Sequence, residues 1–479
     1  MTAVRYVAAG LYRGAPVVNE KKLLQPKVQG SMDNARYAIV ILGASGDLAT
    51  RKLLPALERL FLRGDLPAST TIVGCGRTEI SDEEFRTLCN LSGTFAATVS
   101  YYHGIPGLKK KLAAIGTFTR IVVFMALPPH VYVQTAADLA AEGFGRSTAI
   151  IIEKPFGYDY ASSVKLNAEL VRYFDEPNIF RNDHYLAKEA VQNILVFRFA
   201  NAVFNALWNN QCIESIQISA VETQGVGKRS SYFDHAGIIR DMVQNHLMQL
   251  LCLLTMGSPV SLAAQDISAR KIEVLRSLRV DQCFRSQYEG YRHEQGVAAQ
   301  SDTETYAELK LSINNLRWAG VPVYIRTGKA LNRTGAEIGI RFRQIPGTLF
   351  NSQNEHRNSI IFLIQPQAGI LLNMASKEPG NEMVLTNTSM AFCYSCRFDG
   401  EIPEAYQRLL LDAVRGDHML FVDSCETELS WQVLEPVLDR GLLSYYPQGT
   451  QPPSRFDIQW IDFEQYAAGC SAGATEKNK

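Results

Sequence analysis

A buried strand that turns through two glycines into a helix determines how this chain must begin to fold. The apolar run YAIVIL at residues 37–42 is followed by the turn GASGDLA and then by the helical pattern RKLLPALERLFLRG. This order is typical of the opening of a dinucleotide-binding βαβ unit. Gly43 permits a tight turn, and Gly46 lets the backbone approach a pyrophosphate at the positive end of the helix. The spacing is not the common G-x-G-x-x-G, so the turn alone is also compatible with a βαβ unit that binds no nucleotide.

The end of the next strand indicates which dinucleotide is bound. Residues 71–76 form the second strand of the unit, and Arg77 follows them. An acidic residue at this position would accept hydrogen bonds from the ribose hydroxyls of NAD, whereas arginine favours the 2′-phosphate of NADP. The alternative is that Arg77 is an ordinary surface residue.

Two further apolar strands, at residues 120–127 and 149–153, alternate with helical stretches. This alternation predicts a right-handed parallel α/β sheet. Ligands of such sheets bind at the carboxyl ends of the strands, which puts Lys154 at the mouth of the site. The alternative is a surface lysine whose stem lies along apolar neighbours.

The pattern changes after residue 178. Residues 181–256 are mainly helical, with one strand that ends at Glu222, and alternating strands dominate after residue 306. We therefore expect an α/β domain followed by an α+β domain with a large, mainly antiparallel sheet covered by helices on one face. The expected division is a leader at 1–35, a Rossmann-like coenzyme domain at 36–180, a substrate and oligomerisation domain at 181–465, and a disordered tail at 466–479.

Composition excludes several function classes. Lys plus Arg and Asp plus Glu both number 48, so no global charge attracts nucleic acid or a membrane surface, and no apolar run reaches the length of a bilayer span. The nine cysteines are an odd number spread through a long chain, which argues against a disulfide framework. Cys393 and Cys396 are a close pair without the second pair that a zinc ribbon needs, and we expect them to be strand residues.

The first 35 residues carry more basic than acidic side chains and contain no apolar segment of a signal peptide. We interpret them as a flexible leader and expect a cytoplasmic protein. Organelle targeting by this leader remains an alternative, although serine and arginine are sparse in it.

The stretch RNDHYLAKE at residues 181–189 concentrates an acid, an imidazole, a phenol and an ammonium group before a long apolar helical pattern. If a helix begins near Tyr185, His184 and Lys188 lie one turn apart and can bind one anion, for which a substrate phosphate is the natural candidate. The alternative is a charged helix start in which Asp183 is a simple N-cap.

His246 interrupts the apolar face of a predicted helix and is the candidate general base. A histidine in such a place is often a satisfied core residue, but oxidation of an alcohol requires a group that removes the hydroxyl proton. The base also needs a carboxylate that fixes its tautomer. Asp241 precedes His246 by five residues, which points it away on an α-helix, so Asp183 is the better candidate. Asp241 and Glu222 could then accept from sugar hydroxyls.

The motifs GASGDLA, ALPP, EKPFG, RNDHYLAKE, YFDHAGIIRDMVQNH, LRWAGVPVYIRTGKAL and AYQRLLLDAVRGD together resemble the glucose-6-phosphate dehydrogenase family from about residue 37 to about residue 440. The resemblance implies oxidation of β-D-glucose 6-phosphate at C1 to the lactone with NADP, the first step of the oxidative pentose phosphate pathway, without a metal. It also implies a homodimer or a dimer of dimers.

The resemblance assigns roles to individual residues. His246 resembles the general base and Asp183 its partner, while His184, Tyr185 and Lys188 resemble the phosphate ligands. Lys154 resembles the lysine between substrate and nicotinamide. The positions that resemble sugar contacts are Glu222, Asp241, Lys329 and Gln365. Those that resemble the coenzyme site are Gly43, Ser45, Gly46, Asp47, Leu48 and Arg77.

The sequence also departs from the family pattern. Asn182 and Ala187 replace the usual isoleucine and glycine, and the segment between Arg77 and Phe124 is shorter than usual. Arg333 is the basic residue available to assist the phosphate after the GKALN motif. Some members bind a second, structural NADP through basic residues, and here these positions are Gly335, Gly339 and Leu363. We therefore expect that second site to be absent or weak.

Two other functions fit parts of this sequence. Other sugar dehydrogenases carry an EKP lysine after a Rossmann domain but lack the two histidine-bearing motifs. A non-catalytic sensor of sugar phosphate or NADP could keep the fold, but it would not require His246, Asp183 and Lys188 together.

Overall fold

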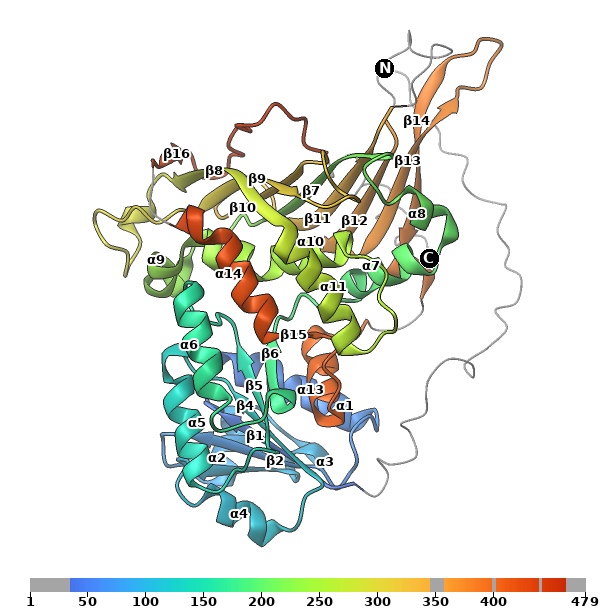
Figure 1. Ribbon diagram of the computed structural model, residues 1–479. Helices are drawn as coiled ribbons and strands as arrows, with labels where there is room; N and C mark the ends of the chain where they lie inside the picture. The colour runs from blue at the N-terminus through green and yellow to red at the C-terminus, as the bar shows by residue number, and fades with distance from the viewer. Residues whose placement is uncertain (1–34, 345–356, 399–401, 439–441, 462–479) are drawn as a thin grey trace, which may run out of the picture. The chain divides into compact units, whose positions relative to one another are not determined.

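The computed structural model describes residues 35–344, 357–398, 402–438 and 442–461, and the described residues from Arg36 onward belong to one compact unit. The leader up to residue 34, the expected tail and Cys470 lie outside the described residues. Two sheets organise this unit (Figure 1).

The first sheet has the strand order β15-β6-β5-β4-β1-β2-β3. All its neighbouring strands run parallel except β6 and β15. This confirms the expected Rossmann-like sheet. Its strands are β1 (Tyr37–Leu42), β2 (Thr71–Gly76), β3 (Val99–His103), β4 (Arg120–Met125), β5 (Ala149–Glu153), β6 (Ile179–Asn182) and β15 (Phe421–Val422).

Helices cover both faces of this sheet. Alternate residues of β1, such as Val40, pack with α4 (Leu108–Ile115), α5 (Tyr132–Ala141) and α6 (Tyr160–Leu170). The other face carries α1 (Leu54–Leu62) and α13 (Ala405–Arg415), which pack on each other (Figure 1). The smaller helical elements of this region are η1 (Ala49–Leu53), α2 (Asp82–Leu88), α3 (Gly93–Ala96), η2 (Pro129–Val131) and η3 (Glu176–Asn178).

The second sheet has the order β14-β13-β12-β11-β7-β10-β9-β8-β16. Only the β7–β10 and β8–β16 pairs are parallel, so the expected mainly antiparallel sheet is confirmed. Its strands are β7 (Ile213–Val221), β8 (Leu278–Tyr288), β9 (Tyr306–Ile313), β10 (Val323–Gly328), β11 (Gly335–Phe342), β12 (Ser359–Gln365), β13 (Gly369–Lys377), β14 (Leu385–Cys393) and β16 (Ser444–Tyr446).

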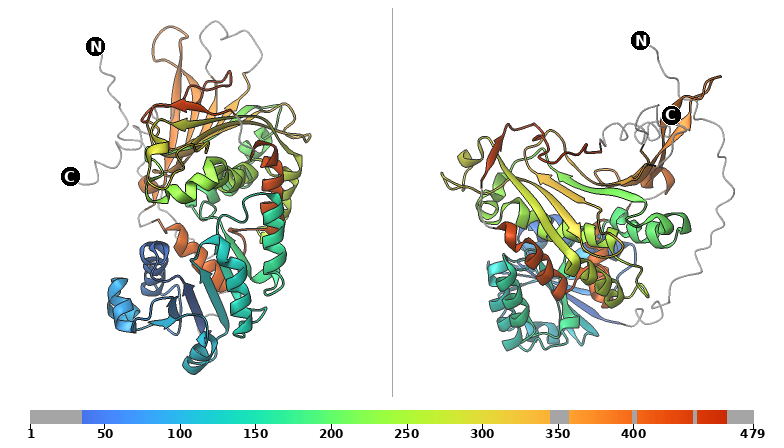
Figure 2. Two further views of the ribbon diagram at one scale, coloured as in Figure 1. Left: turned by 90° about the vertical axis from the view of Figure 1, so that its left-hand side faces the viewer. Right: turned by 45° about the horizontal axis from the view of Figure 1, so that its top comes forward.

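One face of this second sheet is covered by helices (Figures 1 and 2). Residues 456–461 run along the opposite face, where the Gln217 side chain donates to the carbonyl of Gln459 at 3.1 Å and accepts from the Ile461 amide at 2.8 Å. The helical elements of this half are α7 (Glu189–Phe199), α8 (Ala202–Leu207), η4 (Gly227–Arg229), α9 (Ser230–Ile238), η5 (Ile239–Leu247), α10 (Met248–Thr255), α11 (Ala264–Ser277), η6 (Tyr291–His293), α12 (Tyr394–Arg397) and α14 (Ser424–Leu438).

One expectation about elements needs correction, and one pairing was not expected. Cys393 ends β14, but Cys396, which was also expected in a strand, lies in the short helix α12. The C-terminal segment also returns to the first sheet, because β15 pairs with β6 and α13 lies against β4. A two-residue strand such as β15 has too few positions to show an alternating pattern, so sequence periodicity could not reveal it.

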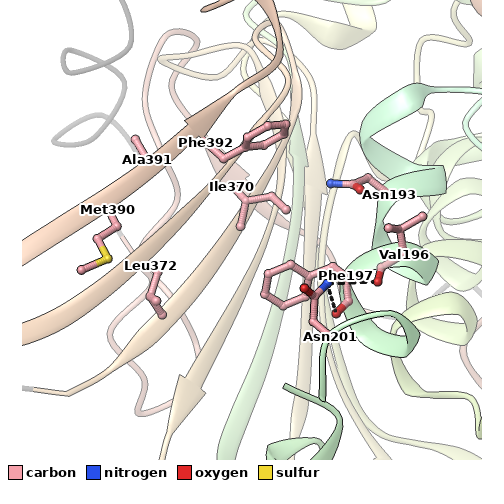
Figure 3. A pocket seen from close by; sticks show the side chains of 9 residues that line it. All are labelled: Asn193, Val196, Phe197, Asn201, Ile370, Leu372, Met390, Ala391 and Phe392. Atoms are coloured by element: carbon pink, nitrogen blue, oxygen red, sulfur yellow. Dashed lines mark hydrogen bonds between the residues drawn. The ribbon is translucent and has the colours of Figure 1, made fainter. Parts of the chain in front are cut away.

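An apolar groove of about 450 Å³ separates α7 from β13 and β14 (Figure 3). Its lining includes Phe197, Ile370, Met390 and Phe392. At its edge the Asn201 side-chain amide donates to the carbonyls of Val196 and Phe197, both at 3.2 Å, and thereby satisfies the last turn of α7. Among the described residues, no helix combines the length and apolar character that crossing a bilayer requires.

Candidate active site

The segment between β6 and α7 forms consecutive turns, so the expected helix start near Tyr185 is wrong. The Asp183 carboxylate accepts from the Tyr185 amide at 3.0 Å, and its carbonyl accepts from Leu186 at 3.0 Å. Aspartate side chains that bond to nearby amides compete with helix formation in this way. The helix begins only at Glu189, after Lys188 in an extended conformation. His184 and Lys188 are therefore placed by turns rather than by one helical turn.

Asp183 contacts His246, as expected. The His246 Nδ1 and Asp183 Oδ1 form a short hydrogen bond, and both side chains are almost completely buried. Because a carboxylate only accepts, Nδ1 carries the proton, and Nε2 is left as the acceptor of the neutral ring. Tyr185 stacks on the imidazole at 4.1 Å between ring centroids, and His184 meets it edge-on at 4.6 Å. The ring is thus held on two sides besides its carboxylate.

The helix that carries His246 differs from the expected α-helix. Residues Ile239–Leu247 form a π-helix, after a break at Gly237 where φ is +71°. A Cβ at Gly237 would lie 2.3 Å from the Glu304 carboxylate, which accepts from the Ile239 amide at 3.2 Å. Single turns of π-helix are frequent at functional sites. The Asp241 carboxylate pairs with a side chain other than His246.

That side chain is Lys154. Its Nζ donates to the Asp241 carbonyl at 2.5 Å and to Asp241 Oδ1 at 3.3 Å. Lys154 directly follows the last residue of β5 and its side chain is largely buried. The ammonium is therefore fixed between the end of the first sheet and the π-helix.

A second lysine–carboxylate pair lies at the end of the second sheet. Lys329 Nζ donates to Glu222 Oε2 at 2.6 Å, and the Glu222 amide donates to the Gly328 carbonyl at 2.9 Å. The two residues follow β10 and β7, which run parallel, so their side chains emerge at one edge of the sheet. Glu222 is partly exposed and remains open to a ligand.

The Lys188 ammonium donates a short hydrogen bond to Gln365 Oε1 and lies 3.9 Å from the centre of the Tyr185 ring. Gln365 is the last residue of β12. The expected phosphate ligands His184, Tyr185 and Lys188 thus gather beside the base, and the structure adds Gln365 to the same cation.

Burial is the largest single influence on the pKa values of the cluster. It lowers the pKa of His246 below its ordinary value, an effect that Asp183 opposes and the Lys154 ammonium reinforces. The imidazole is therefore neutral near pH 7, as a general base must be. Burial likewise lowers the pKa of Lys188 to about 8. Burial also disfavours ionisation of Asp241, but Lys154, Arg229 and Lys329 outweigh it and lower the pKa of this carboxyl to about 2.

The donor atoms of Asp183, His184 and His246 lie within 4.8 Å of one another, a spacing that could formally hold a metal ion. The hydrogen bond between Asp183 and His246 accounts for this pair without one. Such pairing is what a proton-accepting imidazole needs.

The glycine turn after β1 packs against the neighbouring strands. Gly43 has φ +79°, its amide donates to the Cys75 carbonyl at 2.8 Å, and a Cβ at this position would lie 2.4 Å from the Ala126 carbonyl oxygen. No other residue type fits there. The following residues Ser45, Gly46 and Asp47 are exposed at the start of the helical segment. An exposed helix N-terminus with a close-packed glycine turn fits the pyrophosphate of a dinucleotide.

Arg77 is exposed directly after β2, and its carbonyl binds the His103 ring at 2.9 Å. Its guanidinium makes no hydrogen bond with any residue that the structure describes. Because the Gly43 amide binds Cys75 on the same strand, Arg77 and the turn lie at one edge of the sheet. The geometry fits a phosphate on the adenosine ribose.

Sequence reasoning missed two neighbours of the cluster. Glu153 is the last residue of β5, and its carboxylate accepts from Asn182 and from the Tyr406 hydroxyl. The Tyr406 ring is also parallel to His184 at 6.3 Å. Tyr406 lies far along the chain in α13, and its helical pattern contains no signal that would connect it with β5.

The positions expected for a second NADP are packed by the C-terminal segment. A Cβ at Gly339 would lie 2.5 Å from the Ile461 side chain, and Leu363 is buried in a cluster with Ile461. Arg333 pairs with Glu337 on β11 and also donates to Ser219 Oγ at 3.4 Å. The structure therefore places Arg333 against the sheet, beside Gly335.

Comparison with known proteins gives two matching family profiles. Residues 40–193 match the NAD-binding domain of glucose-6-phosphate dehydrogenase, and residues 195–464 match its C-terminal domain. Among curated proteins, a chloroplastic glucose-6-phosphate 1-dehydrogenase of Nicotiana tabacum is 36% identical over 96% of this chain and 87% of its own length. A cytoplasmic one of Arabidopsis thaliana is 39% identical over 89% of this chain and 91% of its own length.

Solved structures give the same result. A glucose-6-phosphate dehydrogenase in complex with its substrate glucose 6-phosphate superposes with a TM-score of 0.84 at 34% identity, and the match covers 89% of this chain and 97% of that one. The glucose-6-phosphate 1-dehydrogenase of Mycobacterium avium gives a TM-score of 0.80 at 31% identity, with 89% and 99% covered.

Proposed function

The chain belongs to the glucose-6-phosphate dehydrogenase family, and we propose that it oxidises β-D-glucose 6-phosphate at C1 to 6-phosphoglucono-1,5-lactone with NADP as coenzyme. The observation that carries this proposal is the buried His246–Asp183 pair next to a cluster of cations and carboxylates. A nicotinamide coenzyme, when bound, accepts the hydride.

His246 acts as the general base. Its Nε2 takes the proton of the C1 hydroxyl while hydride leaves the same carbon, and Asp183 stabilises the imidazolium that forms. The low pKa of the ring keeps Nε2 free for this proton. Tyr185 and His184 hold the ring in its plane.

The phosphate is bound by His184, Tyr185 and Lys188. Lys188 supplies the charge, and on substrate binding its hydrogen bond to Gln365 is replaced or shared with a phosphate oxygen. Glu222, Asp241, Lys329 and Gln365 hold the sugar hydroxyls, and Lys154 lies between the sugar and the nicotinamide.

Residues of the first sheet hold the coenzyme. The turn formed by Gly43, Ser45, Gly46, Asp47 and Leu48 receives the pyrophosphate. Arg77 receives the 2′-phosphate that distinguishes NADP from NAD. Its guanidinium is exposed and has no hydrogen-bond partner among the described residues, which supports this assignment.

We propose that residues 36–180 form most of the coenzyme domain, and that residues 181–465 form the substrate and oligomerisation domain except for β15 and α13, which return to the first sheet. The face of the second sheet that carries no helices supports a homodimer or a dimer of dimers (Figure 2). The sparse serine and arginine of residues 1–35 support a cytoplasmic location.

Formation of NADPH from glucose 6-phosphate tests the function, with NAD assayed in parallel. The matched variant is His246→Asn, which keeps a polar side chain but removes the base. We expect it to bind glucose 6-phosphate and to lose turnover by about 10²–10⁴-fold. A wild-type protein that binds the sugar phosphate and forms no NADPH would instead be the sensor considered above.

A further inference from the structure

Glu153 and Asn182 form a cross-strand pair, and each directly precedes a residue of the candidate active site. Glu153 ends β5, Asn182 ends β6, and the two residues are in register. Lys154 directly follows Glu153, and Asp183 directly follows Asn182. Contacts that fix the backbone of Glu153 and Asn182 therefore also fix where the side chains of Lys154 and Asp183 begin.

The Glu153 carboxylate is held by two uncharged donors. Asn182 Nδ2 donates to Glu153 Oε1 at 2.5 Å, and the Tyr406 hydroxyl donates to the same oxygen at 3.2 Å. The backbone is fixed as well, because the hydroxyl of Tyr132 donates to the Glu153 carbonyl at 3.0 Å and accepts from its amide at 3.1 Å. Asn182 is completely buried, and its Oδ1 has no partner among the described residues. Its amide thus serves this carboxylate alone.

Several titratable groups face Glu153. Lys154 adjoins it on β5, Asp183 follows β6, Tyr132 comes from α5 and Tyr406 from α13. Burial raises the pKa of Glu153 to about 7, while the hydrogen bonds from Asn182 and Tyr406 and the Lys154 ammonium oppose that rise and Asp183 adds to it. The charge of Glu153 therefore changes near pH 7.

We propose that Glu153 is a positioning residue for the reaction, that Asn182 and Tyr406 keep it ionised, and that its charge supports Lys154 and the Asp183–His246 pair. A second carboxylate next to Asp183 increases the proton affinity of Asp183, which strengthens its hydrogen bond to the imidazolium formed during the reaction. The same charge also attracts the Lys154 ammonium, which Asp241 holds by hydrogen bonds. This inference rests on the proposed function.

Ionised Glu153 is the active form, so its protonation lowers turnover without removing the base. The wild-type profile of kcat against pH should therefore show a step of about tenfold near pH 7, above the steeper loss that follows protonation of His246. Loss of the Asn182 donor raises the pKa of Glu153 further, because burial then acts with less opposition. The step should move to higher pH.

Asn182→Leu keeps the branched shape of the side chain and removes the donor, and Glu153→Gln keeps the shape and removes the charge. We expect kcat of N182L at pH 7 to fall about fivefold relative to wild type, in which Glu153 is itself half protonated there, and to recover at alkaline pH, whereas E153Q stays low and shows no step. KM for glucose 6-phosphate should change little in either variant. Asn205→Leu, at an exposed position of α8, is the matched control and should follow the wild-type profile.

A readout that does not need activity is the carboxyl band in infrared spectra of the protein, taken as a pH-difference spectrum of wild type minus E153Q. The band should titrate near pH 7 in wild type and at higher pH in N182L. Profiles of N182L and wild type that coincide in both measurements would overturn the proposal. A wild-type protein without dehydrogenase activity but with the expected infrared titration would instead overturn the proposed function alone.

Discussion

Lys188, which we propose as a ligand of the substrate phosphate, links substrate binding to pH. Its ammonium is held by Gln365 and the Tyr185 ring, and burial lowers its pKa to about 8. The group is charged below that pH and neutral above it, so a phosphate anion loses its cation as the pH rises through about 8. A bound phosphate dianion opposes the deprotonation of Lys188, because it favours the charged ammonium. The loss at high pH therefore appears in kcat/KM, which reports on the free enzyme.

Lys188→Arg should move the alkaline loss of kcat/KM for glucose 6-phosphate to higher pH, because a guanidinium stays charged there. The maximum value should fall, since the longer planar group does not reproduce the geometry of the ammonium. Measurement of kcat/KM between pH 6 and 10 checks this. Lys165→Arg, at an exposed lysine of α6, is the control. An alkaline limb identical to that of wild type would mean that another group controls it.

At the scale of a single side chain, we propose that Arg77 distinguishes NADP from NAD. Arg77→Ala should raise the KM for NADP by about 10–100-fold, the loss of one charge-assisted pair with a phosphate, and should leave the KM for NAD nearly unchanged. Initial rates with both coenzymes measure the effect. Arg63→Ala, which removes an exposed arginine paired with Asp65, is the control. Equal losses for NADP and NAD would remove the assignment.

At the scale of elements, a buried ion pair fastens α14 to the helices beneath the second sheet. Lys271 of α11 lies 2.7 Å from Glu426 of α14, and Gln249 of α10 bonds to both at 3.0 Å. The paired side chains are only 2% and 1% exposed. Removal of only one of the two charged side chains destabilises the folded protein, because the remaining charge stays buried without a counterion.

Lys271→Met should therefore destabilise the protein by about 3–5 kcal/mol, and thermal unfolding followed by circular dichroism should show a clearly lower midpoint. Replacement of Glu426 by Leu in the same chain should recover much of the loss. On the same helix, the exposed Arg270–Glu273 pair, at 2.6 Å, is the control, and Glu273→Ala should cost less than about 1 kcal/mol. A larger loss in the double variant than in K271M would contradict this account.

At the scale of the whole molecule, the C-terminal segment determines which surfaces of the second sheet stay open. Residues 456–461 cross the face without helices, where Arg326 lies 4.2 Å from the centre of the Trp460 ring and Ile461 fills the space above Gly339. Gly335, Gly339 and Leu363 themselves supply no cation for a second dinucleotide, and Ile461 packs on Gly339 and Leu363.

Calorimetric titration of the full chain with NADP should accordingly give one site per subunit. The R77A variant should weaken that site by about 10–100-fold, which distinguishes the coenzyme site from any other. Two sites per subunit in wild type, with one retained at its wild-type affinity in R77A, would show that the second site exists.

The first sheet was predictable from sequence because its strands are buried on both faces and its turn requires glycine. Apolar runs and Gly43 therefore carry the pattern directly. The motifs around Asp183 and His246 likewise identified the residues of the candidate site. The structure corrected the local geometry, since the bonds of Asp183 to nearby amides delay the helix to Glu189 and a π-helix carries His246.

Contacts between segments distant in sequence were decided only by the tertiary structure. The β5–β6 register places Glu153 opposite Asn182, and the return of the chain through α13 brings Tyr406 onto the same carboxylate. Neither periodicity nor residue type encodes such meetings, because they depend on how sheets and helices pack after they have formed. The sequence by itself predicted the groups that we propose for the chemistry, and the packing decided which neighbours set their charge and position.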